Sequence, residues 1–348
     1  MGSAEQTIRL ERPGGYVTVE EIGDGRRRVE TFTDDPDAFV GCRSWETAYP
    51  LDLIETILDV KGLRSVGDEI RREEDPGYLQ HVLWWTLRAH VDPEEIGSAR
   101  ILDFGCGSGA STMILSRMFP EATFLGLDID SEANRIAEGR RRFYGVDRVE
   151  FRLSDEPTGV PAEIGEFDYI VFSALLEHLL PEERKSVIPA LWGRLKPGGL
   201  LFLGETPHRY TPVEIHTTGG LPLVNYLPPS LTLRAAKRFS PRIEETATWD
   251  QLLRRGMRGG TEKEFLRYLK RAGYDDAEIE RPTKQGLRDE FDLWFEISHV
   301  NEMPGFKTKL RSAFRGLKKV TGISFTPYLA FAVRKRPTGG GAGDSKLA

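Results

Sequence analysis

The segment 101–109 constrains the fold more than any other part of the chain. It begins with apolar residues typical of a buried strand, and the acidic Asp103 stands near the end of that strand. Three alternating glycines, Gly105, Gly107 and Gly109, come before a helical pattern over 110–118. Glycine allows a tight turn and lets a ligand come close to the backbone. The order strand, glycine loop and helix therefore predicts a nucleoside-binding turn.

Two kinds of ligand fit a loop of this type. Gly105, Gly107 and Ala110 also satisfy the G-x-G-x-x-A spacing of a dinucleotide site, so the glycines alone do not choose the ligand. Asp103 disfavours a dinucleotide, because a carboxylate repels a pyrophosphate and suits a cation. S-adenosylmethionine (SAM) carries a sulfonium and an ammonium group. The sequence therefore favours SAM and keeps an NAD-dependent oxidoreductase as an alternative.

The run from Asp103 to Gly109 resembles the first motif of the class I SAM-dependent methyltransferases, acid-x-G-x-G-x-G. Four further strand patterns follow in the order that this family shows, over 122–128, 149–155, 167–173 and 200–204. The resemblance covers roughly residues 76–205. It implies a Rossmann-like α/β fold with helices on both faces of a mostly parallel sheet of seven strands. The segments 276–280 and 326–335 are the predicted sixth strand and final antiparallel strand.

The rest of the chain is expected to extend this core. Apolar alternation over 15–32 around Asp24-Gly25 predicts a hairpin, and 51–60 has helical spacing. Prolines and glycines disfavour a regular element for most of 206–260, whose apolar content argues against disorder. The predicted parts are an N-terminal extension over 1–75, a SAM-binding core over 76–205, a lid or acceptor insertion over 206–260, a C-terminal part of the core over 261–336 with an insertion over 284–325, and a disordered tail over 337–348.

Two helix starts can be placed from their capping residues. Ser131 is expected to cap a helix over 132–143. Thr261 with Glu264 three residues later has the pattern of a capping box, and Gly273 is expected to end that helix.

The cofactor residues are expected where the strands end, because ligands of open α/β sheets bind outside the carboxyl ends of the strands. The resemblance implies that Asp128 accepts hydrogen bonds from the ribose hydroxyls and that Asp155 contacts the adenine. Capping of the next helix is the alternative role of Asp128, and a turn before Pro157 is that of Asp155. The full predicted cofactor set is Asp103, Gly105, Cys106, Gly107, Gly109, Asp128, Ile129, Asp155 and Ser173.

Methyl transfer to a hydroxyl requires alignment and benefits from a base. The candidate bases are His178, Glu177, Glu205, His208, Glu214 and His216, of which we predict His216, His178 and His208 as catalytic. The alternative role of His208 and His216 is hydrogen bonding to backbone within the lid. The alternative for His178 is a structural role at the start of a helix.

The lid segment 206–228 resembles a lid in bacterial methyltransferases associated with sugar and polysaccharide clusters. In that pattern a Thr-Pro-Asn-Arg start leads to a His-rich turn and then to Thr-Gly-Leu-Pro, and this chain has His208 in place of the Asn. A divalent ion held by Glu205, His208, Glu214 and His216 is an alternative. The spacing of these four residues matches no standard metal motif, so we predict no metal.

We therefore predict a SAM-dependent methyltransferase that methylates a hydroxyl of a small-molecule or glycan-like acceptor. Methylation at carbon or nitrogen of a lipid, quinone or secondary metabolite is the alternative within the class. A non-catalytic SAM-binding protein is an alternative outside it, together with the NAD-dependent oxidoreductase.

Composition limits the partners and the compartment. The formal net charge of −6 and the pI of about 5.7 disfavour a nucleic-acid partner. Cys42 and Cys106 are expected to be free thiols of a reducing compartment, and the start of the chain has no signal-peptide pattern. We therefore predict a cytoplasmic location.

The segment 306–320 is basic and amphipathic, with Phe306, Leu310, Phe314 and Leu317 on one face. Contact of this segment with an anionic membrane or a lipid-linked acceptor is one interpretation. The favoured interpretation is that the apolar face packs in the core and the cations are solvated.

Overall fold

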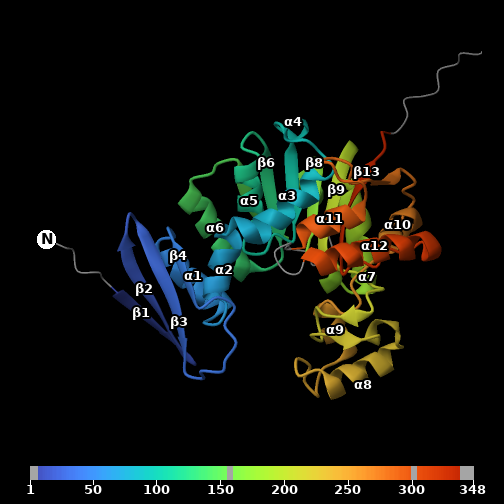
Figure 1. Ribbon diagram of the computed structural model, residues 1–348. Coiled ribbons are helices and arrows are strands. Elements are labelled where there is room, and N and C mark those ends of the chain that lie inside the picture. Colours follow the sequence, from blue (N-terminus) through green and yellow to red (C-terminus); the bar gives the residue numbers. More distant parts are fainter. Residues whose placement is uncertain (1–6, 155–159, 299–303, 338–348) are drawn as a thin grey trace, which may run out of the picture. The chain divides into compact units, whose positions relative to one another are not determined.

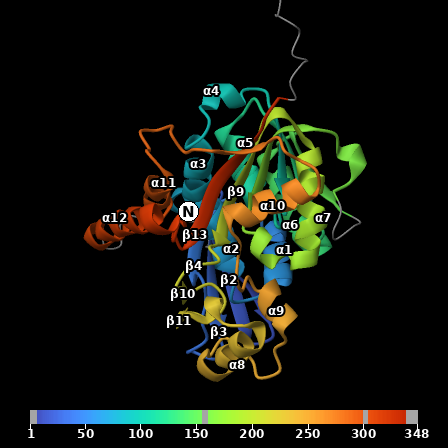
Figure 2. The same cartoon turned by 90° about the vertical axis from the view of Figure 1, so that its right-hand side faces the viewer.

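The computed structural model describes residues 7–154, 160–298 and 304–337 (Figures 1 and 2). The predicted adenine contact, Asp155, and nearly all of the predicted tail lie outside these ranges. The chain divides into two compact units, each of which is described by itself. Unit 1 comprises Met1–Trp84 and Gly105–Asp155, and unit 2 comprises Trp85–Phe104 and Glu156–Ala348.

A seven-stranded mixed sheet has the strand order β12-β13-β9-β8-β5-β6-β7. Its strands are β5 (Arg100–Phe104), β6 (Thr123–Asp128), β7 (Val149–Leu153), β8 (Phe167–Ser173), β9 (Leu195–Pro207), β12 (Ala277–Glu280) and β13 (Tyr328–Lys335). β8 pairs in parallel with β5 and β9, and β6 pairs in parallel with β7. β13 is antiparallel to both of its neighbours. The predicted Rossmann-like sheet and its antiparallel last strand are confirmed.

Unit 1 begins with an antiparallel sheet of four strands, followed by two helices (Figure 1). The elements are β1 (Thr7–Arg12), β2 (Gly15–Gly23), β3 (Arg26–Thr33), β4 (Ser44–Thr47), α1 (Leu51–Lys61) and α2 (Val66–Glu74). The predicted hairpin is present, and Asp24 and Gly25 turn it with positive φ angles of 52° and 71°. Valines of β2 and β3 pack on apolar residues of α1 and α2 in one buried cluster.

That cluster also includes a helix of the predicted cofactor core. The helices that follow α2 include η1 (Pro76–Gln80), α3 (His81–Arg88), α5 (Ala110–Met118) and α6 (Ser131–Tyr144), and of these α6 contributes to the cluster. Ile136 of α6 is fully buried among the apolar residues of α1 and α2. Adding a Cβ to Gly139 would bring it to 2.7 Å from Leu53 Cδ1, so α6 and α1 pack closely. The N-terminal extension is therefore part of the same core as α6.

The predicted cap of α6 is wrong by one residue. Asp130 accepts hydrogen bonds from the Glu132 and Ala133 amides at 2.9 and 3.1 Å, and Ser131 is the first residue of the helix. A carboxylate one position earlier reaches these amides from extended backbone, as a capping residue must. The cap at Thr261 of α10 is as predicted.

A buried arginine ties the extension to the glycine loop within unit 1. The Arg140 side chain of α6 is fully buried and donates to Glu69 Oε1 at 2.9 Å and to the Tyr49 hydroxyl at 3.1 Å. The same guanidinium donates to the carbonyl and the hydroxyl oxygen of Ser108, at 2.8 and 2.9 Å. Burial raises the pKa of Glu69, but the charge of Arg140 and other groups outweigh this, so that pKa is lowered overall.

Unit 2 contains β5, β8, β9, β12 and β13 with the helices that flank them. These are α4 (Pro93–Ile96), η2 (Ala162–Ile164), η3 (Leu176–His178), α7 (Pro181–Gly193), α10 (Glu262–Arg271), α11 (Glu290–Ile297) and α12 (Pro304–Thr321). Among the described residues, every helix is too short or too polar to span a bilayer.

The segment 206–260 of unit 2 is partly irregular, as predicted, but it includes two helices that the prolines did not suggest. Its elements are β10 (Val213–Glu214), β11 (Leu221–Pro222), η4 (Val224–Tyr226), α8 (Pro229–Phe239) and α9 (Trp249–Arg254). Pro229 lies at the start of α8, where a missing amide hydrogen costs nothing. The helices α8 and α9 (Figures 1 and 2) and the residues next to them share a small core of Ala236, Ile243, Ala247, Leu252 and Met257.

We predict that Arg140→Met lowers the free energy of unfolding by about 3–5 kcal/mol, because it leaves the Glu69 carboxylate and Tyr49 buried without their partner. Urea denaturation measures this change. Arg141→Met is the control, since the neighbouring Arg141 forms only a partly exposed ion pair with Glu138 and should change stability by less than about 1 kcal/mol. Equal effects of the two substitutions would contradict the role of Arg140.

Candidate active site

The glycine loop of unit 1 is folded against the end of β6. The Leu127 carbonyl accepts the amides of Gly105 and Cys106 at 2.8 and 3.3 Å. The Gly107 amide donates to Asp128 Oδ2 at 2.7 Å. Gly107 has a positive φ of 52°, and a Cβ there would meet no atom within 4 Å. The loop therefore turns in the left-handed region and leaves open space beside it, as a loop that admits a nucleoside requires.

Gly109 is needed for a different reason. Its φ is 79°, and a Cβ would come within 2.7 Å of Phe151 Cζ and 2.8 Å of Ala137 Cβ. The start of α5 therefore packs so closely on β7 and α6 that any side chain would collide.

Asp128 is held in place by backbone amides. Besides the Gly107 amide, its carboxylate accepts the amides of Ile129 at 2.7 Å and Asp130 at 2.9 Å. Since Asp130 caps α6, the alternative role of Asp128 as the cap does not apply. Ile129 is 59% exposed directly after this carboxylate, which is unusual for an isoleucine. An oriented acid beside an exposed apolar side chain suits the ribose and the base of a nucleoside.

Unit 2 places its own predicted residues at the carboxyl ends of adjacent parallel strands. Asp103 is 3% exposed near the end of β5, and Ser173 ends β8. The Ser173 hydroxyl donates to Glu205 Oε2 of β9 at 3.2 Å. Ala174 and Glu205 have φ angles of 52° and 57°, which are strained for residues that carry a side chain. Strain of this kind concentrates at functional sites.

Two of the predicted histidines lie together in unit 2, beside a buried glutamate. The ring centroids of His178 and His216 are 5.9 Å apart. The Glu177 side chain is 1% exposed, and its Oε1 lies 3.8 Å from His178 Nε2. The other carboxylate oxygen, Oε2, accepts the Thr206 hydroxyl at 2.8 Å. Tyr328 also faces His216, with ring centroids 6.5 Å apart.

The end of the lid helix α9 orients both rings. His178 Nδ1 lies 2.7 Å from the Arg254 carbonyl oxygen, and His216 Nδ1 lies 3.1 Å from that of Arg255. The last carbonyls of a helix have no partner within it, and a carbonyl can only accept, so both Nδ1 atoms carry hydrogen. In the neutral rings Nε2 is then the basic atom. The Arg254 side chain pairs with Glu183 of α7 and so anchors α9.

The environment keeps His216 neutral. Burial lowers the pKa of His216 and the neighbouring His178 lowers it further, while burial raises the pKa of Glu177. Gly256 allows the close packing, because a Cβ there would lie 2.5 Å from His216 Nδ1 and 3.3 Å from Glu177 Cγ. A neutral imidazole can take up a proton, which a charged one cannot.

His208 has a different environment from the pair. It is 4% exposed, its Nδ1 accepts the Tyr210 amide at 3.2 Å, and burial lowers its pKa to about 4. His208 and His216 line one cavity of only about 10 Å³, which is room for about one water. Glu214 is also occupied within the lid, since its carboxylate accepts the amides of Thr217 and Thr218 at 2.9 and 2.6 Å.

The structure does not gather Glu205, His208, Glu214 and His216, the four residues considered as metal ligands in the sequence analysis, into one metal-binding cluster. Among the described residues, the cluster that could hold an ion is Glu177, His178 and His216, with one ligand atom of each within 4.8 Å of the others. Ligand atoms around a tetrahedral zinc ion are about 3.3 Å apart. The ligand atoms of the three side chains would therefore have to move closer to one another to bind such an ion.

Comparison with known proteins fits this geometry. A family model described as a methyltransferase domain matches residues 101–199, which include the glycine loop, Asp128, Ser173 and His178. The chain carries a class I SAM-dependent methyltransferase domain. The match favours SAM over the dinucleotide that the glycine spacing left open.

The chain is similar over part of its length to two methyltransferases and to one solved structure. Trans-aconitate 2-methyltransferase of Variovorax paradoxus is 36% identical over 117 residues, which are 34% of this chain and 42% of that protein. The mitochondrial ubiquinone biosynthesis O-methyltransferase of Bos taurus is 30% identical over 128 residues, or 36% of this chain and 34% of that protein. The chain thus spans less than half the length of either relative. The apo methyltransferase SibL has a TM-score of 0.42 at 14% identity, covering 82% of this chain and 62% of that chain.

Sequence reasoning missed some residues around the pair of His178 and His216. Tyr328, Thr206 and Gly256 contact or approach the pair from β13, β9 and the end of α9. Gly256 could have been suspected from its place in a glycine-containing turn. No local signal marks Tyr328, because strand pairing alone brings it beside the lid.

We predict that the stability of the protein depends on pH through His208. Its pKa is about 4 in the folded state and about 6.5 in the unfolded chain, so the unfolded chain binds the proton first. The neutral ring therefore stabilises the fold above pH 6.5, and this contribution is lost as the pH falls from about 6.5 to 4. His208→Asn keeps an acceptor for the Tyr210 amide and removes this titration. On acidification, the free energy of unfolding of the variant should therefore rise relative to that of wild type by up to roughly 3 kcal/mol. Thermal unfolding at several pH values measures the difference, and parallel curves would contradict the prediction.

Proposed function

We propose that this chain is a SAM-dependent methyltransferase that transfers a methyl group to a hydroxyl oxygen of a small-molecule or glycan-like acceptor. The observation that carries the proposal is the pair formed by His178 and His216, whose Nδ1 atoms donate to successive carbonyls at the end of α9. Such a pair supplies a base, which an alcohol needs and a more acidic acceptor does not. The bovine relative is an O-methyltransferase, which supports methylation at oxygen.

The cofactor half of the proposed site is the glycine loop with Asp128 and Ile129. The Asp128 carboxylate has about four acceptor positions, of which three are occupied by backbone amides. We assign the remaining position to the ribose and the exposed Ile129 side chain to the adenine. Gly105, Cys106, Gly107 and Gly109 form the turn along which the nucleoside lies. Asp103 and Ser173, at the carboxyl ends of β5 and β8, stay predictions as cofactor residues.

When bound, SAM supplies an electrophilic methyl carbon and a neutral sulfide leaving group. His216 or His178 takes the proton of the acceptor hydroxyl at Nε2 as the oxygen bonds to that carbon. Glu177, beside His178, stabilises the imidazolium that results. His208 is assigned to lid structure rather than to proton transfer, because its Nδ1 already accepts a backbone hydrogen bond.

The alternative of carbon or nitrogen methylation has its own support in the apolar residues of the lid. Leu223, Tyr226 and Leu231 are 59%, 48% and 44% exposed and would suit a lipid or quinone acceptor. Transfer of labelled methyl from SAM to a panel of glycosides, phenols and quinols, followed by mass spectrometry of the product, identifies the methylated atom. Label found only on carbon or nitrogen would overturn the proposal of O-methylation.

We also propose a cytoplasmic location, because Cys42 and Cys106 are both free thiols.

We predict that Asp128→Asn weakens SAM binding by about tenfold to hundredfold, because a charged acceptor of the ribose hydroxyls becomes neutral. Isothermal titration calorimetry with SAM measures the loss. Asp130→Asn is the matched control, since asparagine caps a helix as well as aspartate does. Tighter binding of NAD than of SAM by the wild-type protein would overturn the cofactor assignment.

We predict that His216→Gln or His178→Gln lowers kcat by about a hundredfold or more. Each substitution removes either the base that takes the acceptor's proton or the histidine beside that base. SAM affinity should stay unchanged, and His208→Asn should keep nearly full turnover. In the wild-type protein kcat should fall in acid, because a protonated His216 cannot take up a proton, whereas chelation with EDTA should leave kcat unchanged. If both histidine variants kept full turnover, the pair would not be the base.

A further inference from the structure

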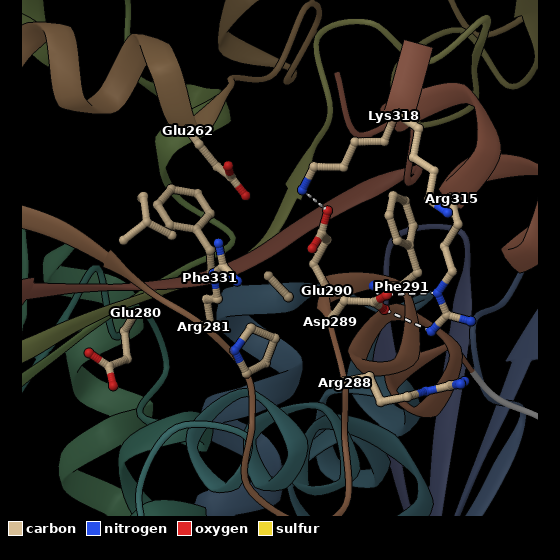
Figure 3. A pocket seen from close by; sticks show the side chains of 14 residues that line it. Glu262, Glu280, Arg281, Arg288, Asp289, Glu290, Phe291, Arg315, Lys318 and Phe331 are labelled. Atoms are coloured by element: carbon tan, nitrogen blue, oxygen red, sulfur yellow. Dashed lines mark hydrogen bonds and ion pairs between the residues drawn. The ribbon is translucent and has the colours of Figure 1, made fainter. Parts of the chain in front are cut away.

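The helix α12 contacts α11 through ion pairs as well as through one aromatic side chain, Phe314. Figure 3 shows Arg315 reaching Asp289 of α11 and Lys318 reaching Glu290, both at the wall of a cavity of about 470 Å³. Arg315 Nε and Asp289 Oδ2 are 2.7 Å apart. The positive charge on this side is therefore neutralised within unit 2.

The apolar residues of α12 are divided between its two sides. Phe314 packs inward, with ring centroids 5.5 Å from Trp294 and 6.4 Å from Phe291. Phe306 and Leu317, which were expected to share a core-packed face with Phe314, are 60% and 41% exposed. That expectation is wrong for these two residues, because the ion pairs with α11 turn them away from the protein.

The exposed residues form one stripe along the helix. Phe306, Ala313, Leu317 and Val320 are all exposed, Val320 to 86%. At 3.6 residues per turn they lie within about 60° of one another around the helix axis. An apolar stripe of this length on a surface helix is unfavourable in water unless something covers it.

The charge around this stripe is uniformly positive. The segment 304–321 contains six lysines and arginines and no acidic residue, although the whole chain has a net charge of −6. Among the described residues, Lys309 and Lys319 have no ion-pair partner, whereas Arg311, Arg315 and Lys318 pair with α11. Lys309 lies about 60° from Phe306 around the helix axis and so borders the stripe.

We propose that α12 docks on an anionic lipid surface, lying in the plane of the headgroups with Phe306, Leu317 and Val320 inserted. The stripe is the ridge of a single helix and has no groove for a peptide, whereas a ridge of apolar residues beside lysines suits a headgroup layer. A second copy fits less well, since a two-fold contact between these faces would bring lysines together with no acid on α12 to pair them. The proposal does not depend on the methyl acceptor.

Co-sedimentation of the full-length protein with vesicles tests the proposal. The probes are vesicles of phosphatidylcholine alone and of equal parts phosphatidylcholine and phosphatidylglycerol. We expect binding to the anionic vesicles, little binding to the neutral ones, and weakening of the binding at high salt.

Two variants of α12 separate the apolar and charged contributions. Phe306→Ser/Leu317→Ser should weaken binding to the anionic vesicles by at least about tenfold, through lost apolar insertion. Lys309→Glu/Lys319→Glu should weaken it by about tenfold or more, since each lysine attracts the anionic surface. Because these side chains are exposed, the thermal midpoint should stay near the wild-type value.

The matched control lies on α8, which exposes a phenylalanine and a leucine to nearly the same extent. Phe239 and Leu231 are 66% and 44% exposed, against 60% and 41% for Phe306 and Leu317. Phe239→Ser/Leu231→Ser should leave vesicle binding unchanged. Equal losses of vesicle binding in the α12 and α8 double-serine variants would overturn the assignment to α12.

Three further outcomes would overturn the proposal. The first is absence of binding to the anionic vesicles, and the second is equal binding to neutral and anionic vesicles. The third is a change of molar mass in light scattering for the α12 serine variant without any change in vesicle binding. That result would make the stripe a contact between copies of this chain.

Discussion

The buried guanidinium of Arg140 is the interaction on which the cofactor half of the protein depends. It lies inside unit 1 and satisfies groups from three places at once, namely Tyr49, Glu69 and Ser108. A buried arginine without water needs protein acceptors for its donors, and the N-terminal extension and the glycine loop both supply them. The extension is therefore part of the support of the loop and not an attachment to it.

A similar constraint acts on the acceptor half in unit 2. The carbonyls at the end of α9 have no partner in their own helix, and the imidazoles of His178 and His216 provide one. This arrangement selects the tautomer in which Nε2 is basic. Arg254 holds α9 to Glu183, so the segment 206–260 supplies the geometry of the proposed base.

The helix α12 shows how ion pairs can reverse the usual amphipathic arrangement. Its arginines form ion pairs with carboxylates of α11 and of its capping residue, and this pairing turns Phe306 and Leu317 outward. Helical periodicity correctly indicates that an apolar face exists. It does not indicate which side of the helix has partners within the protein, since those partners belong to another helix.

The sequence by itself determined the sheet, the glycine loop and the position of Asp128 at the end of β6. These are local patterns, because the φ angles of Gly105 and Gly107 and the carboxylate of Asp128 act on their immediate neighbours. The histidine pair and its partner Tyr328 were decided by tertiary structure alone, since they come from η3, the lid and β13. Neither α9 nor the register of β13 has a signal that points to these partners. Contacts between segments far apart in the chain depend on packing, which local periodicity does not encode.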